Sequence, residues 1–129
     1  MFHSFEDLEV WKKACQLCVE LHAALKGCGA AWMRDQMLRA ALSIASNIAE
    51  GAERNSRYDF IRFLNIARAS AAELRTQLYI SVRIGLLTQD QVAELITETK
   101  TIARMTHALI AALRKSDLTT EHRKLKTEN

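Results

Sequence analysis

The strongest constraint on this chain of 129 residues is its shortage of turn-forming residues, with four glycines and no proline. Because glycine and proline supply most tight turns, a β-sandwich with many turns is not expected. The glycines fall at Gly27 with Gly29, at Gly51 and at Gly85. The segments between them carry apolar residues at the spacing of three and four that is typical of an amphipathic helix. The sequence therefore predicts an all-α fold, an up-down-up-down antiparallel four-helix bundle.

The predicted helices cover about residues 5–26, 31–51, 57–84 and 89–115, which together make one domain over residues 1–115. Ser4 and Ser56 stand where N-caps are needed, and Thr88 with Gln91 has the composition of a capping box. Gly51 is expected to end the second helix as a left-handed C-terminal cap. The polar residues 116–129 continue none of these patterns and are expected to form a frayed or disordered tail.

The apolar stripes identify the side of each helix that is expected to face the core. On the first three helices they consist of Leu8, Trp11, Cys15, Cys18, Leu21 and Leu25; of Met33, Met37, Ala41, Ile44 and Ile48; and of Phe60, Phe63, Ala67, Ala71, Leu74 and Leu78. The fourth stripe consists of Val92, Leu95, Ile96, Thr99, Ile102, Ala103, Thr106, Leu109, Ile110 and Leu113.

The third helix is apolar on more than its core side. A second stripe contains the predicted oligomer contacts Tyr58, Ile66, Ala69 and Ile80. A third contains the predicted nucleic-acid contacts Arg57, Arg68, Arg75 and Tyr79. A helix with several apolar sides usually has more than one packing partner, so the second stripe is expected to pack on a neighbouring subunit. The alternative is that these side chains are simply exposed, since single surface hydrophobes are common.

The sequence predicts no catalytic, cofactor-binding or metal-binding residues. The four histidines are scattered, and the chain has neither a glycine-rich phosphate loop nor a His-Glu-x-x-His motif. Cys15, Cys18, His22 and Cys28 approach the spacing of a zinc knuckle, but the two first cysteines lie within a predicted helix. Buried free thiols that act as small hydrophobes explain them better than zinc does.

The expected compartment is the cytoplasm. The N-terminal residues lack the pattern of a signal peptide, and the longest stretch without Asp, Glu, Lys or Arg covers the ten residues 40–49. About 20 apolar residues are needed to cross a bilayer, so no membrane partner is expected. Three cysteines also do not form a secreted disulfide framework.

A polar stripe on the second helix contains Ser43, Asn47, Glu50 and Arg54, which are separated by four, three and four residues. Arg57 and Arg62 follow just after the turn, within reach of this stripe in an antiparallel hairpin. One interpretation is a network that fixes how the second and third helices meet. The other is a site for an anionic partner, because 11 of the 18 cationic residues are arginines.

The segment from Arg39 to Gly51, RAALSIASNIAEG, resembles the hallmark of a bacterial family of four-helix-bundle proteins encoded by intervening sequences within 23S ribosomal RNA genes. The similarity continues through Arg54, residues 60–67 and residues 70–78, and covers about residues 4–114. This chain departs from the family at Ala45, where proline is usual, at Ala69, where glycine is usual, and in the loop between the first two helices.

The resemblance implies a four-helix bundle that assembles as a cyclic homopentamer. A more distant relative, the accessory variability protein of diversity-generating retroelements, is a basic pentameric barrel that binds nucleic acid and a reverse transcriptase. The resemblance implies that seven residues are important, without giving them a chemical role: Asn47, Glu50, Arg54, Arg62, Ser70, Glu73 and Gln77. We call these seven residues, together with Ser43, the polar motif.

The predicted function is that of a non-enzymatic, oligomeric accessory factor that associates with RNA or DNA through arginine-rich surfaces. The alternative is a structural or protein-interaction module that docks another protein and binds no nucleic acid. The formal net charge of +3 is small for one chain, but it multiplies in an oligomer.

Overall fold

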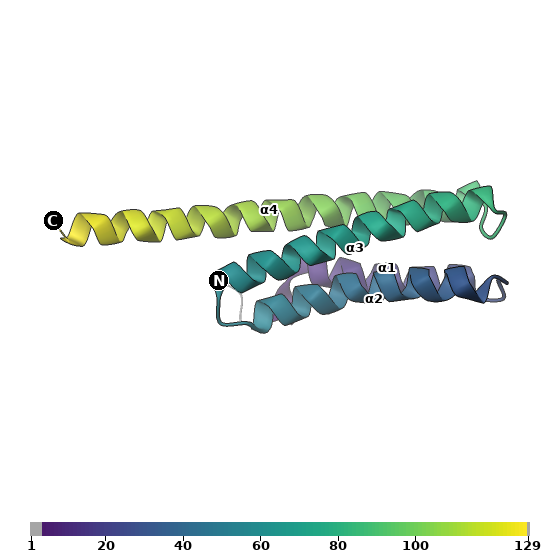
Figure 1. Cartoon of the computed structure of the whole chain (residues 1–129), viewed down its shortest axis with the longest axis horizontal. Coiled ribbons are helices and arrows are strands. Elements are labelled where there is room, and N and C mark those ends of the chain that lie inside the picture. Colours follow the sequence, from purple (N-terminus) through teal and green to yellow (C-terminus); the bar gives the residue numbers. More distant parts are fainter. Residues whose placement is uncertain (1–3, 129) are drawn as a thin grey trace.

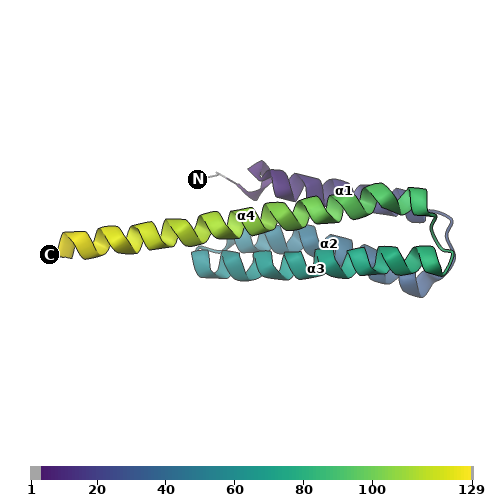
Figure 2. The same ribbon diagram turned by 90° about the horizontal axis from the view of Figure 1, so that it is seen from above.

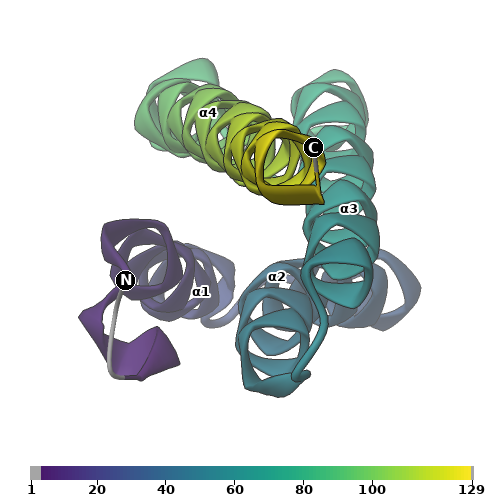
Figure 3. The same cartoon turned by 90° about the vertical axis from the view of Figure 1, so that its left-hand side faces the viewer.

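The computed structural model describes the backbone of residues 4–128 and the side chains of residues 4–116. After a short 3₁₀ turn, η1 (Phe5–Asp7), it contains the four helices α1 (Glu9–Leu25), α2 (Ala31–Glu53), α3 (Arg57–Arg83) and α4 (Gln89–Glu128). Consecutive helices are antiparallel and pack side by side, and α4 also packs on α1 (Figures 1 and 3). The predicted up-down-up-down four-helix bundle is confirmed.

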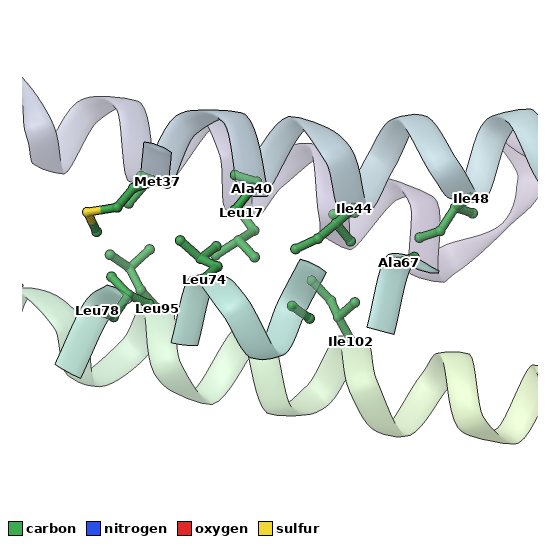
Figure 4. Close-up of a cluster of buried hydrophobic side chains, with 14 of the residues drawn as sticks. Leu17, Met37, Ala40, Ile44, Ile48, Ala67, Leu74, Leu78, Leu95 and Ile102 are labelled. Carbon is green, nitrogen blue, oxygen red and sulfur yellow. The ribbon is translucent and has the colours of Figure 1, made fainter. Parts of the chain in front are cut away.

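The core lies along the axis of the bundle, where each helix contributes its apolar stripe (Figure 4). Leu17, Ile44, Leu74 and Ile102 come from the four helices, and each is at most 1% exposed. Full burial of such a side chain contributes about 1.5–3 kcal/mol relative to exposure. The stripes predicted for α2 and α3 are fully buried, and most of the stripe on α4 is buried as well.

The stripe predicted for α1 is partly wrong. The buried residues of this helix are Val10, Ala14, Leu17, Leu21 and Leu25. Cys15 and Cys18, which were expected in the core, are only half-buried, and of the two Cys18 packs against the border of the core. Turning α1 in this way buries the larger aliphatic side chains of Val10 and Leu17 in place of the thiols, which removes more apolar surface from water.

The start of α1 also differs from the prediction. The Ser4 side chain accepts a hydrogen bond from the backbone amide of Glu6, so that it caps η1, and α1 begins only at Glu9. The other two caps are confirmed. Ser56 Oγ accepts from the amide of Asp59 at 3.1 Å. Thr88 and Gln91 make the reciprocal bonds of a capping box, at 3.2 and 2.8 Å.

Gly51 does not cap a helix, which corrects the sequence prediction. It is buried inside α2, and the helix continues to Glu53. A Cβ on Gly51 would lie 2.6 Å from Cβ of Phe63 on α3, so the absence of a side chain lets the two helices approach closely here. Left-handed glycines instead follow α1, at Gly27 with φ of 76°, and α3, at Gly85 with φ of 78°. After α3, Leu86 N–H bonds to the Ser81 carbonyl at 2.8 Å in a Schellman motif.

The C-terminal part of α4 projects beyond the other helices (Figure 2). The helical backbone continues to Glu128, past the predicted end at residue 115, and residues 116–128 contain neither glycine nor proline to interrupt it. Among the side chains that the structure describes, which end at Ser116, the last buried core residue of α4 is Leu113. Side chains after Ser116 lie outside the described residues, and the fraying predicted for residues 116–129 stays a prediction. In the described part of the chain, no helix has the length and apolar character that a membrane crossing requires.

Candidate functional site

The first part of the polar motif lies where α2 meets α3. Ser43 Oγ on α2 lies 2.9 Å from Ser70 Oγ on α3. Asn47 donates to the carbonyl of Ser43 at 2.7 Å and to its Oγ at 3.0 Å. Ser70 is only 8% exposed, so its hydroxyl needs this partner in place of water. The contact between Ser43 and Ser70 joins the two helices, whereas both bonds of Asn47 lie within α2.

A second part of the motif surrounds Phe63. Arg54 and Glu50 form an exposed ion pair on α2, with 3.1 Å between Nη2 and Oε1. The guanidinium groups of Arg54 and Arg62 lie 5.2 and 4.7 Å from the centre of the Phe63 ring. Arg62 also approaches Asp59, at 3.6 Å. Arg54 of the α2 stripe and Arg62 of α3 therefore share the Phe63 ring as a neighbour.

The third part of the motif lies farther along α3. Gln77 donates to Glu73 at 3.4 Å. The carbonyl oxygen Oε1 of Gln77 is buried, and it has no hydrogen-bond partner among the described residues. These hydrogen bonds, ion pairs and ring contacts divide the polar motif into three local groups, in place of the single set expected from the sequence.

The positive charge of the protein is concentrated in α3 and α4. Residues 60–116 contain eight lysines and arginines and four acidic residues, a net charge of +4. The remaining 72 residues contain ten cationic and eleven acidic residues, a net charge of −1. On α4, no acidic residue occurs between Thr99 and Ser116. The surplus of positive charge therefore lies on the side of the bundle that α3 and α4 form.

Arg68 on α3 faces α4, where it lines a hollow of about 480 Å³ together with Ala103, Arg104 and His107. We call this hollow the α3–α4 basic hollow. Arg75 and the 49%-exposed Tyr79 follow farther along α3. Arg57 is separate from this group, because it lines a different hollow at the α2–α3 turn with Arg54 and Asn55. Of the four predicted nucleic-acid contacts, the basic hollow therefore contains only Arg68.

Sequence reasoning missed the contribution of α4 to this surface. Lys100, Arg104, His107 and Arg114 are exposed and follow at spacings of four, three and seven, which keeps them near one side of the helix. The signal that could have found them is the acid-free stretch of residues 99–116. That these α4 residues lie close to Arg68 becomes apparent only when the register between α3 and α4 is known.

The predicted oligomer contacts of α3 are exposed. Tyr58 is 76% exposed, Ile66 38% and Ile80 42%, and Ala69 is also exposed. Tyr58, Ile66 and Ala69 line an open hollow of about 630 Å³, together with Ile61, Arg62, Asn65 and Arg114. Ile80 does not line this hollow. We call the exposed residues Tyr58, Ile66, Ala69 and Ile80 the outer face of α3.

The cysteines have the environment of weakly reactive thiols. Burial raises the pKa of Cys15 and Cys18 above the usual 9.0, and the neighbouring Cys18 raises that of Cys15 further. Cys28 Sγ lies 3.7 Å from the carbonyls of Ala24 and Leu86. Within the described residues, no group of three or more His, Cys, Asp or Glu side chains is arranged to hold a metal ion.

Comparison with known proteins identifies the family. A family model described as 23S rRNA-intervening sequence protein matches residues 6–108. The chain belongs to this family. The matched range begins in η1 and ends in α4, so it contains all eight residues of the polar motif and the α3–α4 basic hollow.

A solved structure supports the assignment to the 23S rRNA-intervening sequence protein family. It is a crystal structure of a protein of unknown function from the S23 ribosomal protein family of Bacteroides thetaiotaomicron. It is 28% identical to this chain, with a TM-score of 0.72, and the match covers 78% of this chain and 97% of that one. A comparison with curated proteins finds no match.

Proposed function

We propose that this member of the family is an oligomeric accessory factor of the cytoplasm that acts by binding nucleic acid and not by catalysis. The observation that carries the proposal is the charge distribution: a net +4 over residues 60–116, against −1 for the rest of the chain. A polyanion is attracted to such a one-sided cationic surface, and Lys and Arg that neutralise its phosphates supply most of the non-specific affinity. Arg68, Arg75 and Tyr79 are the α3 residues proposed to contact phosphates and bases.

Assembly increases this attraction. The outer face of α3 exposes three large apolar side chains, and its hollow of about 630 Å³ offers room for side chains of a second copy of the chain. The family resemblance implies a cyclic pentamer. Five copies would carry a formal charge of about +15, which extends the field that recruits a phosphate backbone.

The nucleic-acid proposal is tested by fluorescence anisotropy with a labelled 20-nucleotide RNA of mixed sequence at low salt. The double variant Arg68→Ala, Arg75→Ala is expected to bind about tenfold more weakly, since roughly one phosphate contact is lost with each arginine. The matched control Lys12→Ala, Lys26→Ala removes the same charge from the α1 side, where both lysines are exposed. Equal affinity of the two double variants would contradict the proposed surface.

Oligomerisation is tested by light scattering at micromolar concentration. Ile66→Asp is expected to lower the mass of the assembly while the circular dichroism spectrum stays helical. Leu42→Asp is the control, because Leu42 is 58% exposed on α2 and does not line the hollow of the outer face. A wild-type protein with the mass of one chain would contradict the proposed assembly.

One observation favours the second candidate, a structural or protein-interaction module. The polar motif makes contacts within the chain, between Ser43, Asn47 and Ser70, and none of these three has a role that requires nucleic acid. Absence of RNA and DNA binding at low salt, together with an intact oligomer, would favour this module over the nucleic-acid factor.

A further inference from the structure

We propose that Arg68, Arg104 and His107 form a binding site for one phosphodiester group of a nucleic acid, built jointly by α3 and α4 in the α3–α4 basic hollow. The inference rests on the proposed function and deepens it, because it names a specific site and the chemical group that the site receives. Neither Arg104 nor His107 belongs to the contacts predicted from the sequence.

The geometry of the hollow brings the three side chains together from two antiparallel helices. Arg68 is half-buried at the border of α3 and α4, whereas Arg104 and His107 are exposed on α4 one helical turn apart. Ala103 lines the same hollow with only a methyl group. A small residue in that place leaves room of about 480 Å³ for a group that is held by the surrounding nitrogen donors.

The donors of the hollow are not neutralised by the protein. Among the described residues, Arg68 and His107 make no side-chain hydrogen bond or ion pair, and Arg104 donates only to the hydroxyl of Thr101, at 3.2 Å. The acidic residue of α3 after Asp59 is Glu73, which accepts a hydrogen bond from Gln77. On α4, the acid-free stretch of residues 99–116 includes both Arg104 and His107. The half-buried guanidinium of Arg68 and the exposed guanidinium of Arg104, neither of which is paired with a carboxylate among the described residues, can bind a phosphate with charge-assisted hydrogen bonds.

The surroundings favour a phosphate in a polymer over an isolated anion. Arg75 follows Arg68 by seven residues on α3, and the exposed Lys100 precedes Arg104 by four on α4. These spacings correspond to about 10 and 6 Å of helix, and because α3 and α4 are antiparallel, both cations lie toward the same end of the bundle from the hollow. A repeating polyanion can contact all of them at once, whereas a single carboxylate or free phosphate contacts only the central group.

The test measures binding of a labelled 20-nucleotide RNA, and of a DNA of the same sequence, to the full chain over a range of salt concentrations. The variants are Arg68→Gln, Arg104→Gln, His107→Gln and the double variant Arg68→Gln, Arg104→Gln. Lys12→Gln on α1 is the control that removes one charge from outside the hollow. Circular dichroism and light scattering confirm that each variant keeps its helices and its assembly. Inorganic phosphate serves as a competitor.

The site predicts that Arg104→Gln weakens RNA and DNA binding roughly three- to tenfold and lowers the salt dependence by about one phosphate contact. The double variant should lose less than the product of the two single effects, because both arginines hold the same group. Millimolar inorganic phosphate is expected to leave binding of the polymer intact.

Three results would overturn the site. If the wild type binds RNA but Arg104→Gln behaves like Lys12→Gln, the hollow is not the site, although the proposed function still stands. If Arg104→Gln weakens RNA binding and leaves DNA binding unchanged, the residue recognises ribose and not phosphate. If the wild type binds neither polymer at low salt, both the site and the proposed function are wrong.

Discussion

Gly51 on α2 lies so close to Phe63 on α3 that a Cβ on the glycine would be 2.6 Å from Cβ of the phenylalanine. Of all the helix pairs, α2 and α3 share the most extensive contact. The absence of a side chain on Gly51 allows the two helices to approach closely here. The same seam contains the hydrogen bond between Ser43 and Ser70 and the arginines that cover the Phe63 ring. Two contacts of polar-motif residues therefore cross this seam: Ser43 with Ser70, and Arg54 with the Phe63 ring.

Gly51→Ala is expected to destabilise the protein by roughly 1–3 kcal/mol, because the new methyl group meets a rigid Cβ and the helices must separate. The better helix propensity of alanine, about 1 kcal/mol, offsets only part of this cost. Urea unfolding at fixed protein concentration measures the difference. Gly29→Ala is the control, since nothing lies within 4 Å of its added Cβ. Equal stability of the two variants would contradict the close approach.

Ser43 and Ser70 are expected to stabilise the fold as a pair. Replacing either with alanine should cost about 1 kcal/mol, since one hydroxyl of a half-buried hydrogen bond is lost. The double variant should cost less than the two single changes together. If the losses of unfolding free energy measured in urea were additive, the hydrogen bond of 2.9 Å between Ser43 and Ser70 would contribute no coupling energy.

Glu50→Ala is expected to change the stability by no more than about 0.5 kcal/mol, because the ion pair with Arg54 is exposed and is screened by solvent. Thermal and urea unfolding measure this effect. A large loss of stability, or loss of the assembly in light scattering, would show that Glu50 has a structural partner beyond Arg54.

Because of the thiols of α1, the protein is expected to lose folding stability at alkaline pH. Burial raises the pKa of Cys15 and Cys18 above 9.0, so the fold favours their protonated form. This contribution is fully present below the pKa of the unfolded chain and is lost as the pH rises through the folded-state pKa. As the pH rises above the ordinary thiol pKa of 9.0, the unfolding free energy of the wild type should fall more than that of Cys15→Ser, Cys18→Ser. Equal pH dependence under reducing conditions would refute the burial effect.

Removal of residues 117–129 is expected to leave the unfolding midpoint unchanged, because Leu113 is the last buried core residue among the described side chains of α4, which end at Ser116. Truncation after Leu109 also removes Ile110 and Leu113, and should cost roughly 3 kcal/mol or more. If deletion of residues 117–129 alone destabilised the protein by more than about 1 kcal/mol, the segment would have a packing role.

The fold was predictable because its signals are local and consistent with one another. Three- and four-residue apolar spacing located the helices, and Ser56 and Thr88 marked two of their starts. The errors have physical causes. Gly51 resembles a cap in the sequence, but its neighbour Phe63 is supplied by another helix. Cys15 and Val10 are both apolar, and only packing in the core decides which of the two is buried.

The candidate site was predictable only in part. Arg68 could be identified because it repeats with Arg75 along one helix. Its relation to Arg104 and His107 depends on the register of α3 against α4, which no spacing within a single helix contains. The same limit applies to Ser43 and Ser70, whose contact is formed between helices.

The most direct test of nucleic-acid binding by this protein is the salt dependence of RNA affinity for the wild-type chain. Anisotropy titrations between about 50 and 300 mM salt should give an affinity that falls steeply and linearly on a double-logarithmic plot, as expected when several phosphates are neutralised by Lys and Arg. Absence of binding at 50 mM salt, or an affinity that does not change with salt, would contradict a nucleic-acid surface on α3 and α4.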